Sequence, residues 1–304
     1  MKKIIYICFL AACLSLQASA QTPSDAIMMG KGQICFGLFY THDTWDEYWE
    51  GTLKRNNGNI GTLTRQTVMP MFSLGLLDRL NLLAALPWVR TEASAGQVKG
   101  AQGFQDWGVW LKGEAFKLDN ETGDLSLHAI AGFGGPASNY LPDFAPFSLG
   151  LGCLDASLRG VLQYKLDKGP YARVTGAYHL RGNCIIERDY YYTTQGYYTE
   201  EVDMPNALTY GATIGTWLFD DSFKIEATYD GLKTLGGHDI RRQDAGFPSN
   251  RMIFTRVGGG LQYYFPFAPN LSVTASGGYV LSGRNVGQSL MLTGGVTYVL
   301  GLWQ

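Results

Sequence analysis

The residues of this chain that could do chemistry are charged side chains that alternate with apolar ones. In the stretches 154–166 and 173–184, every second residue is apolar or small, and the turn residues 167–170 separate the two stretches. A period of two places the charged side chains on one face of a long β-hairpin and the apolar side chains on the other. The charged face of this hairpin holds Asp155, Arg159, Arg173, His179 and Arg181.

Other alternating stretches carry polar or aromatic side chains in the equivalent positions. These positions hold Asp106, Trp110, Lys112, Glu114, Lys224, Glu226 and Arg256. We predict that this charged face lines a wet interior. It could form a constriction that selects solutes by charge and size, or a solvated lumen whose charges pair across strands. Both signs are mixed along the stretches, so no ring of one sign and no strong ion selectivity is expected.

The length of the alternating stretches points to a membrane. Strands of soluble sandwiches are typically about 5–6 residues long, whereas a tilted strand that crosses a bilayer needs roughly 9–11. The hairpin stretches run to 13 and 12 residues. We therefore predict an all-β protein, a single antiparallel transmembrane β-barrel whose apolar face contacts lipid.

About 12 such stretches follow one another along the chain. The connections between them alternate between short ones, centred on residues 78, 120, 168, 220 and 267, and longer ones near 52, 97, 140, 196, 242 and 284. Short periplasmic turns and longer extracellular loops are typical of outer-membrane barrels. The expected strands are 33–40, 65–76, 80–90, 104–116, 124–133, 154–166, 173–184, 207–218, 223–231, 251–265, 271–281 and 288–302.

The first 20 residues resemble an export signal. Two lysines precede an apolar run, and Ala18-Ser19-Ala20 matches a cleavage site, so we expect residues 1–20 to be a signal peptide and 21–304 to form the barrel. A lipoprotein signal acylated at Cys13 is the alternative. The segment before the first strand is only about a dozen residues, which argues against a separate plug domain.

The net charge narrows the possible functions of the protein further. The net charge of −2 becomes −4 once Lys2 and Lys3 are removed, which gives no sign of nucleic-acid binding.

Three cysteines, Cys35, Cys153 and Cys184, lie beyond the expected signal peptide. Aligned apolar faces require paired positions of the hairpin to sum to an even number such as 336. Because 153 and 184 give an odd sum, we expect the two thiols to point to opposite faces, unless a bulge permits a bridge.

Aromatic residues gather in two of the long loops, at Trp45, Tyr48, Trp49, Tyr191 and Tyr198. They could form an apolar docking patch at the barrel mouth, belong to the interfacial girdle of aromatic side chains, or pack the loops together.

Enzyme motifs are missing from the sequence. It contains no G-x-S-x-G, H-E-x-x-H or C-x-x-C motif and no EF-hand spacing, so we expect no catalytic residue, metal or cofactor. A lipid-modifying barrel enzyme remains an alternative. A Ser or carboxylate near His179 or His128 at the rim would favour it.

Two short motifs resemble a known family. Residues 76–89, LLDRLNLLAALPWV, and 103–112, GFQDWGVWLK, are similar to segments of the outer-membrane channels named for the MetA pathway of phenol degradation. The resemblance covers about Thr67–Phe116, and Gln105 replaces the second glycine of the family motif. It implies a channel for small, often hydrophobic, compounds.

These observations predict a passive channel for small, hydrophobic or aromatic solutes in the outer membrane of a Gram-negative bacterium. Its expected partners are outer-membrane lipid and the solute, and it would be a monomer or a small homo-oligomer. The third possibility, beside the channel and the enzyme, is a non-conducting surface barrel that binds ligands or has a structural role.

Overall fold

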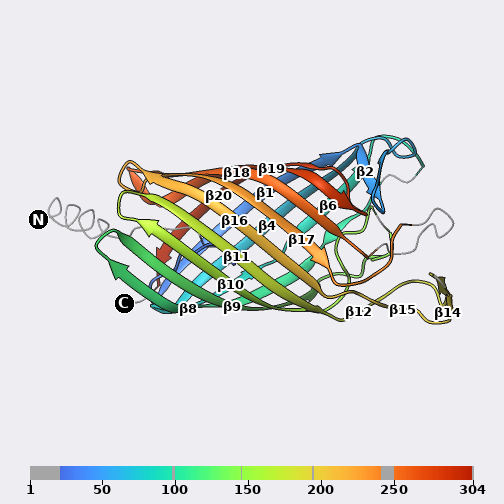
Figure 1. Cartoon of the computed structure of the whole chain (residues 1–304), viewed down its shortest axis with the longest axis horizontal. Coiled ribbons are helices and arrows are strands. Elements are labelled where there is room, and N and C mark those ends of the chain that lie inside the picture. The colour runs from blue at the N-terminus through green and yellow to red at the C-terminus, as the bar shows by residue number, and fades with distance from the viewer. Residues whose placement is uncertain (1–20, 98–99, 145, 194, 241–249, 303–304) are drawn as a thin grey trace, which may run out of the picture.

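The chain forms a closed antiparallel β-barrel (Figure 1). The computed structural model describes residues 21–97, 100–144, 146–193, 195–240 and 250–302. The expected signal peptide and Cys13 therefore lie outside the described residues. The first strand, β1, pairs with both β4 and the last strand, β20, which closes the sheet. No helix in the described ranges is long and apolar enough to cross a membrane.

Twelve strands build the barrel wall, as predicted, and two of them are interrupted. Leu86 and Pro87 separate β5 from β6, and Gln105 separates β7 from β8. Proline has no N–H to donate to the ladder, which accounts for the first break and for the weak alternation there. The wall consists of β1 (Gln33–Trp45), β4 (Leu63–Leu77), β5 (Leu80–Ala85) with β6 (Trp88–Ala93), β7 (Gln102–Phe104) with β8 (Asp106–Asn120), β9 (Gly123–Pro136), β10 (Asp155–Leu166), β11 (Pro170–Arg181), β16 (Ala207–Leu218), β17 (Phe223–Thr234), β18 (Ile253–Phe265), β19 (Ala268–Arg284) and β20 (Leu290–Gly301).

The register of β10 and β11 places the charged and apolar residues on opposite faces. Asp155 pairs with Arg181, and Leu162 with Val174, so that each pair sums to 336 as the sequence predicts. Leu158 is 66% exposed, whereas Val161 is fully buried. Exposed apolar residues continue around the outside of the barrel, for example Val174 and Ile214. An outer apolar belt of this kind is expected of a barrel whose outside faces lipid.

The two ends of the barrel differ. Both ends of the described chain and the short turns lie at one end, whereas the long connections lie at the other (Figure 1). Gly169 takes a positive φ of 104° in one short turn, where a Cβ would lie 2.2 Å from the Trp217 carbonyl oxygen. Three small hairpins extend the loop end: β2 (Glu47–Glu50) with β3 (Leu53–Asn56), β12 (Asn183–Ile185) with β15 (Glu201–Asp203), and β13 (Tyr191–Tyr192) with β14 (Gly196–Tyr197).

The cysteines differ from the expectation. Cys153 and Cys184 are free thiols, and both lie in one buried apolar cluster with Ile186, Val202 and Met204. The prediction of opposite faces was wrong because it extended the β10–β11 ladder too far. Cys153 precedes β10, and Cys184 lies in β12, beyond the end of β11, so neither follows the alternation of the wall.

Candidate functional site

The inward charges of β11, β17 and β18 form networks within the lumen. Arg256 binds the carboxylate of Asp230 through two nitrogens, with Nε at 3.2 Å from Oδ1 and a terminal nitrogen at 2.9 Å from Oδ2. Glu226 accepts a hydrogen bond of 2.6 Å from the Tyr171 hydroxyl and lies 3.6 Å from both Arg173 and Lys224. Charges of opposite sign on the same, neighbouring and next-neighbouring strands compensate one another in this way and hold the lumen polar.

A second network lies nearer the loop end. The Asp155 carboxylate lies 3.0 Å from His179 Nδ1 and 3.4 Å from Arg181 Nε. The other ring nitrogen of His179, Nε2, lies 3.3 Å from the Thr209 hydroxyl. This chain of Thr209, His179 and Asp155 has the order of a nucleophile, a base and an orienting carboxylate. It faces the barrel interior, and Arg181 also binds its carboxylate.

The remaining residues singled out in the sequence lie on β8 and β10. Asp106 accepts hydrogen bonds from the Tyr140 hydroxyl and, at 2.9 Å, from the Leu151 amide, so it fastens the 137–154 loop. Glu114 lies 3.5 Å from Arg79 beside a short turn. An added Cβ at Gly132 would lie 2.4 Å from the Trp110 ring, so that glycine makes room for the indole. A shared constriction of all these residues stays a prediction.

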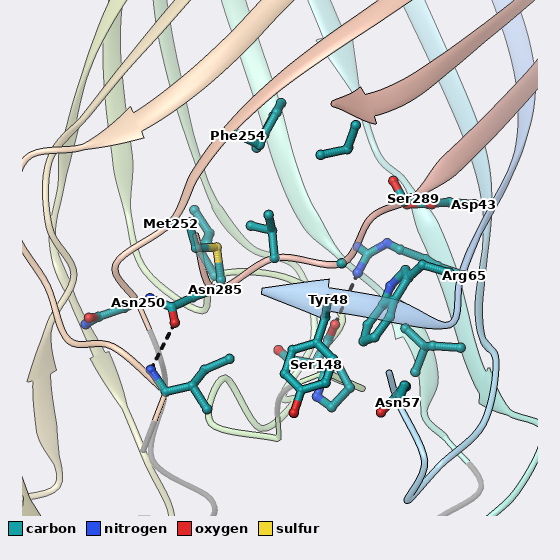
Figure 2. Close-up of a pocket in the computed structure, with 18 of the residues that line it drawn as sticks. Asp43, Tyr48, Asn57, Arg65, Ser148, Asn250, Met252, Phe254, Asn285 and Ser289 are labelled. Carbon is teal, nitrogen blue, oxygen red and sulfur yellow. Dashed lines mark hydrogen bonds between the residues drawn. The ribbon is translucent and has the colours of Figure 1, made fainter. Parts of the chain in front are cut away.

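A cavity of about 900 Å³ opens at the loop end of the lumen (Figure 2). We call it the vestibule. Arg65 on β4 lies at its wall and donates hydrogen bonds to the carbonyl oxygens of Ser148 and Leu149, so one cation holds the loop over the lumen. The apolar side chains of the vestibule come from several loops and strands and include Trp45, Ile60, Leu63, Met252 and Phe254. A largely apolar lining with a few convergent polar groups is typical of small-molecule sites.

The N-terminal segment, residues 21–31, enters the opposite end of the lumen. Gln21, Asp25 and Met29 are each at most 6% exposed. Lys112 is completely buried and donates hydrogen bonds of 2.8 Å to Asp25 Oδ1 and 3.1 Å to the Thr22 carbonyl oxygen. A burial this complete would be costly for the ammonium without its partner. The segment is thus anchored by an ion pair.

Sequence reasoning missed the role of this segment. It excluded a separate plug domain from the length of the segment, but a dozen residues suffice to turn back into the lumen. Asp25 is the sole charged residue between residues 21 and 30, next to an apolar run that ends at Met29. A lone carboxylate in such a segment was the signal that could have pointed to a buried cationic partner.

Burial and the ion pair act on Asp25 in opposite directions. Burial alone would raise the pKa of this carboxyl. The Lys112 charge, the Lys112 hydrogen bond, the Arg173 charge and the Ile27 amide together hold the pKa below its ordinary value. Asp25 is therefore ionised at neutral pH, and its carboxylate compensates Lys112.

The loop aromatics lie in three different surroundings. Trp49 is 8% exposed, and a Cβ at Gly283 would lie 2.6 Å from its ring, so it packs the first loop against β19. Trp45 and Tyr48 line the vestibule with ring centroids 6.1 Å apart. Tyr191 stacks on Tyr197 in the hairpin beyond β12, where Tyr198 is 90% exposed. Docking of a partner there stays a prediction.

In the described parts of the chain, no group of three or more His, Cys, Asp or Glu residues could hold a metal ion.

Comparisons with known proteins extend this description. No family model and no curated protein matches the chain. Among solved structures, the chain is similar to an outer-membrane channel from Pseudomonas putida F1, with a TM-score of 0.68, 17% identity, and coverage of 92% of this chain and 100% of that one. At this identity the likeness establishes the barrel fold alone.

Two further structures are less similar. The TodX monoaromatic hydrocarbon channel, studied as a deletion mutant, has a TM-score of 0.45, 11% identity, and coverage of 91% of each chain. The KdgM porin in complex with disordered oligogalacturonate has a TM-score of 0.44, 10% identity, and coverage of 86% of this chain and 98% of that one. Both likenesses are too weak to support an inference.

Proposed function

We propose that this protein is a passive outer-membrane channel for small solutes, closed in the observed state by its own N-terminal segment. Solutes would enter the vestibule from outside the cell and pass the inward charges of the wall. Transport would be passive, down the concentration gradient of the solute, with no energy-coupling partner. The protein would reside in the outer membrane of a Gram-negative bacterium as a monomer or small homo-oligomer.

The observation that carries the proposal is the arrangement of the lumen. A vestibule of about 900 Å³ lies at the loop end, above a charge-lined interior, and what enters the opposite end is a short segment rather than the wall itself. A non-conducting barrel would fill its lumen with side chains of the wall strands. The ion pair between Asp25 and Lys112, hydrogen bonds from Asn81 and Lys112 to carbonyl oxygens of the segment and the packing of Met29 hold the segment in place. None of these contacts is a ladder bond of the wall, so the segment could leave while the sheet stays closed.

The lining of the vestibule favours solutes with an apolar body. Trp45, Ile60 and Phe254 offer aromatic and aliphatic surface, and Asn57 adds a polar group that could orient a solute. The sequence motifs of residues 76–89 and 103–112 resemble those of channels for such compounds. We therefore propose small hydrophobic or aromatic molecules as the solutes.

Planar-bilayer recording tests the proposal. The mature protein should show infrequent openings, and a variant that lacks residues 22–28 should conduct for most of the time. Uptake of small neutral sugars into liposomes should increase in the same order. The channel proposal is wrong if neither protein carries current and neither admits a solute.

One observation favours an enzyme as the second candidate. The hydrogen-bonded chain of Thr209, His179 and Asp155 could in principle activate the threonine hydroxyl for attack on an ester. The chain faces the lumen, away from the lipid, so its substrate would be a solute rather than a phospholipid. Hydrolysis of a small chromogenic ester that disappears in His179→Gln would support the enzyme. Equal background rates in both proteins would exclude this activity for the ester used.

A further inference from the structure

Most inward cations of the wall are compensated by the wall or its loops. Arg256 pairs with Asp230, Arg181 with Asp155, and Arg173 and Lys224 share Glu226. Arg65 binds two carbonyl oxygens of the 137–154 loop. Lys112 and Arg159 are different, because neither has a carboxylate partner on the wall strands.

Lys112 and Arg159 lie close together in the sheet. Ile130 of β9 pairs with Lys112 of β8 on one side and with Arg159 of β10 on the other. Directly paired residues of an antiparallel ladder point to the same face, so both cations project into the lumen. Their backbones are two strand spacings apart, roughly 10 Å. Two side chains of this length can therefore reach one small anion between them.

One of these two cations, Lys112, already binds a carboxylate. Asp25 accepts a 2.8 Å hydrogen bond from Lys112, and it belongs to the N-terminal segment rather than to the wall. Within the described ranges, the half-buried guanidinium of Arg159 makes no hydrogen bond and no ion pair. A partly desolvated cation without a partner favours an anion over water.

Resting on the proposed function, we propose that Lys112 and Arg159 bind the carboxylate of an amphipathic solute. In the closed channel, the carboxylate of Asp25 occupies the position on Lys112 that the solute's carboxylate would take. The solute is a small monocarboxylate with an aromatic or alkyl body. Its apolar part suits the vestibule, through which it would pass first, and its carboxylate then replaces that of Asp25 on Lys112 and engages Arg159. Arrival of the solute and release of the segment are then one competition for the same cation.

Binding of benzoate to the purified, full-length mature protein tests the inference. Asp25→Asn should bind benzoate at least about tenfold more tightly than the wild type. In the wild type, Asp25 fills the site most of the time, and the measured affinity equals the intrinsic affinity multiplied by the fraction of time that the site is vacant. Adding Arg159→Gln should abolish this gain, whereas Arg159→Lys should keep most of it. Benzamide, which has the same shape but no charge, should bind all variants equally weakly.

Two results would overturn the inference: equal benzoate affinity in the wild type and in Asp25→Asn, or a gain for benzamide as large as that for benzoate. Circular dichroism checks that each variant is folded, and the variant lacking residues 22–28 replaces Asp25→Asn if the latter does not fold. Conductance of the same preparations separates the two proposals. Conducting protein without a benzoate gain contradicts this inference alone, whereas the absence of current in every variant contradicts the channel.

Discussion

Gly75 of β4 and Gly30 of the N-terminal segment are in direct backbone contact. A Cβ added to Gly75 would lie 2.0 Å from the Gly30 carbonyl oxygen, which is far inside contact distance. Nearby, the Gly32 amide donates a 2.9 Å hydrogen bond to the Gly75 carbonyl oxygen. At this point the segment can therefore lie against the inner wall only because Gly75 carries no side chain.

Gly75→Ala should displace the N-terminal segment and increase the open probability of the channel several-fold. The added methyl group cannot coexist with the Gly30 carbonyl, which is backbone and cannot turn aside as a side chain would. Single-channel recording measures the effect. Gly160→Ala is the matched control, because a Cβ there would meet no atom within 4 Å. Equal behaviour of both variants would argue against this contact as a fastening of the gate.

Leu162→Arg should lower the free energy of unfolding by about 2–4 kcal/mol, the range for a cation placed on the lipid face near the bilayer centre. Leu162 is 41% exposed on the outer face near the middle of β10. The neighbouring change Gln163→Arg puts the same charge into the polar lumen and should cost far less. Urea titrations in lipid vesicles compare the two. Similar costs for both would contradict the assignment of faces.

Replacing Arg159 and Arg181 together by alanine should shift ion selectivity toward cations. The double variant removes two positive charges from the lumen and leaves Asp155 with His179 as its remaining partner. The shift appears as a change of reversal potential in a potassium chloride gradient. Lys54→Ala, in the exposed β2–β3 hairpin, should leave the reversal potential unchanged. Lack of any shift in the double variant would mean that these side chains lie off the ion path.

The hydrogen bonds at the vestibule rim should persist down to unusually low pH. The hydrogen bonds from Arg284 and Asn285 lower the pKa of Asp239 to about 2, against the opposing effect of burial. An ionised Asp239 stabilises the loop fully above its unfolded pKa of 3.8, and the stabilisation is lost as the pH falls through about 2. Hydrogen exchange of the Ile240 amide, which donates to Asn285 Oδ1, reports on the rim. Rate-corrected protection should persist at pH 3 in the wild type and be lost in Asp239→Asn at neutral pH. Protection that survives this substitution would show that Asp239 is not what holds the rim.

The wall was predictable because the membrane imposes a simple rule on every strand. A lipid-facing position must be apolar and the next position can be polar, so the period of two in residues 154–166 specifies both the strand and its register with β11. Where the chain departs from this alternation, the sequence does not predict the path of the backbone. The stretch 80–90 was expected to form one continuous strand, but Pro87 cannot donate to the ladder and separates β5 from β6. Cys184 lies where the chain has left the wall.

The site was harder to predict because its partners come from outside the alternation. Lys112 was recognised as an inward charge, but its partner Asp25 lies 87 residues earlier in a segment with no periodicity. Likewise, Arg65 is held by backbone carbonyls at Ser148 and Leu149, which leave no trace in residue types. Periodicity identifies the face of a strand, but not which loop or terminus comes to rest against it.

The pairing of β1 with β20 also has a consequence for biogenesis. The two strands are joined along twelve paired positions, from Gln33 with Gly301 to Thr44 with Leu290, although they come from opposite ends of the chain. Contacts of such large sequence separation form late, because closing a long loop costs entropy before the contacts form. The N-terminal segment instead contacts Gly75, Asn81 and Lys112, which lie on β4, β5 and β8 and outside that ladder. The polar contacts that dock the segment and the ladder that closes the wall therefore use different residues, so that docking of the segment and closure of the wall are separable events.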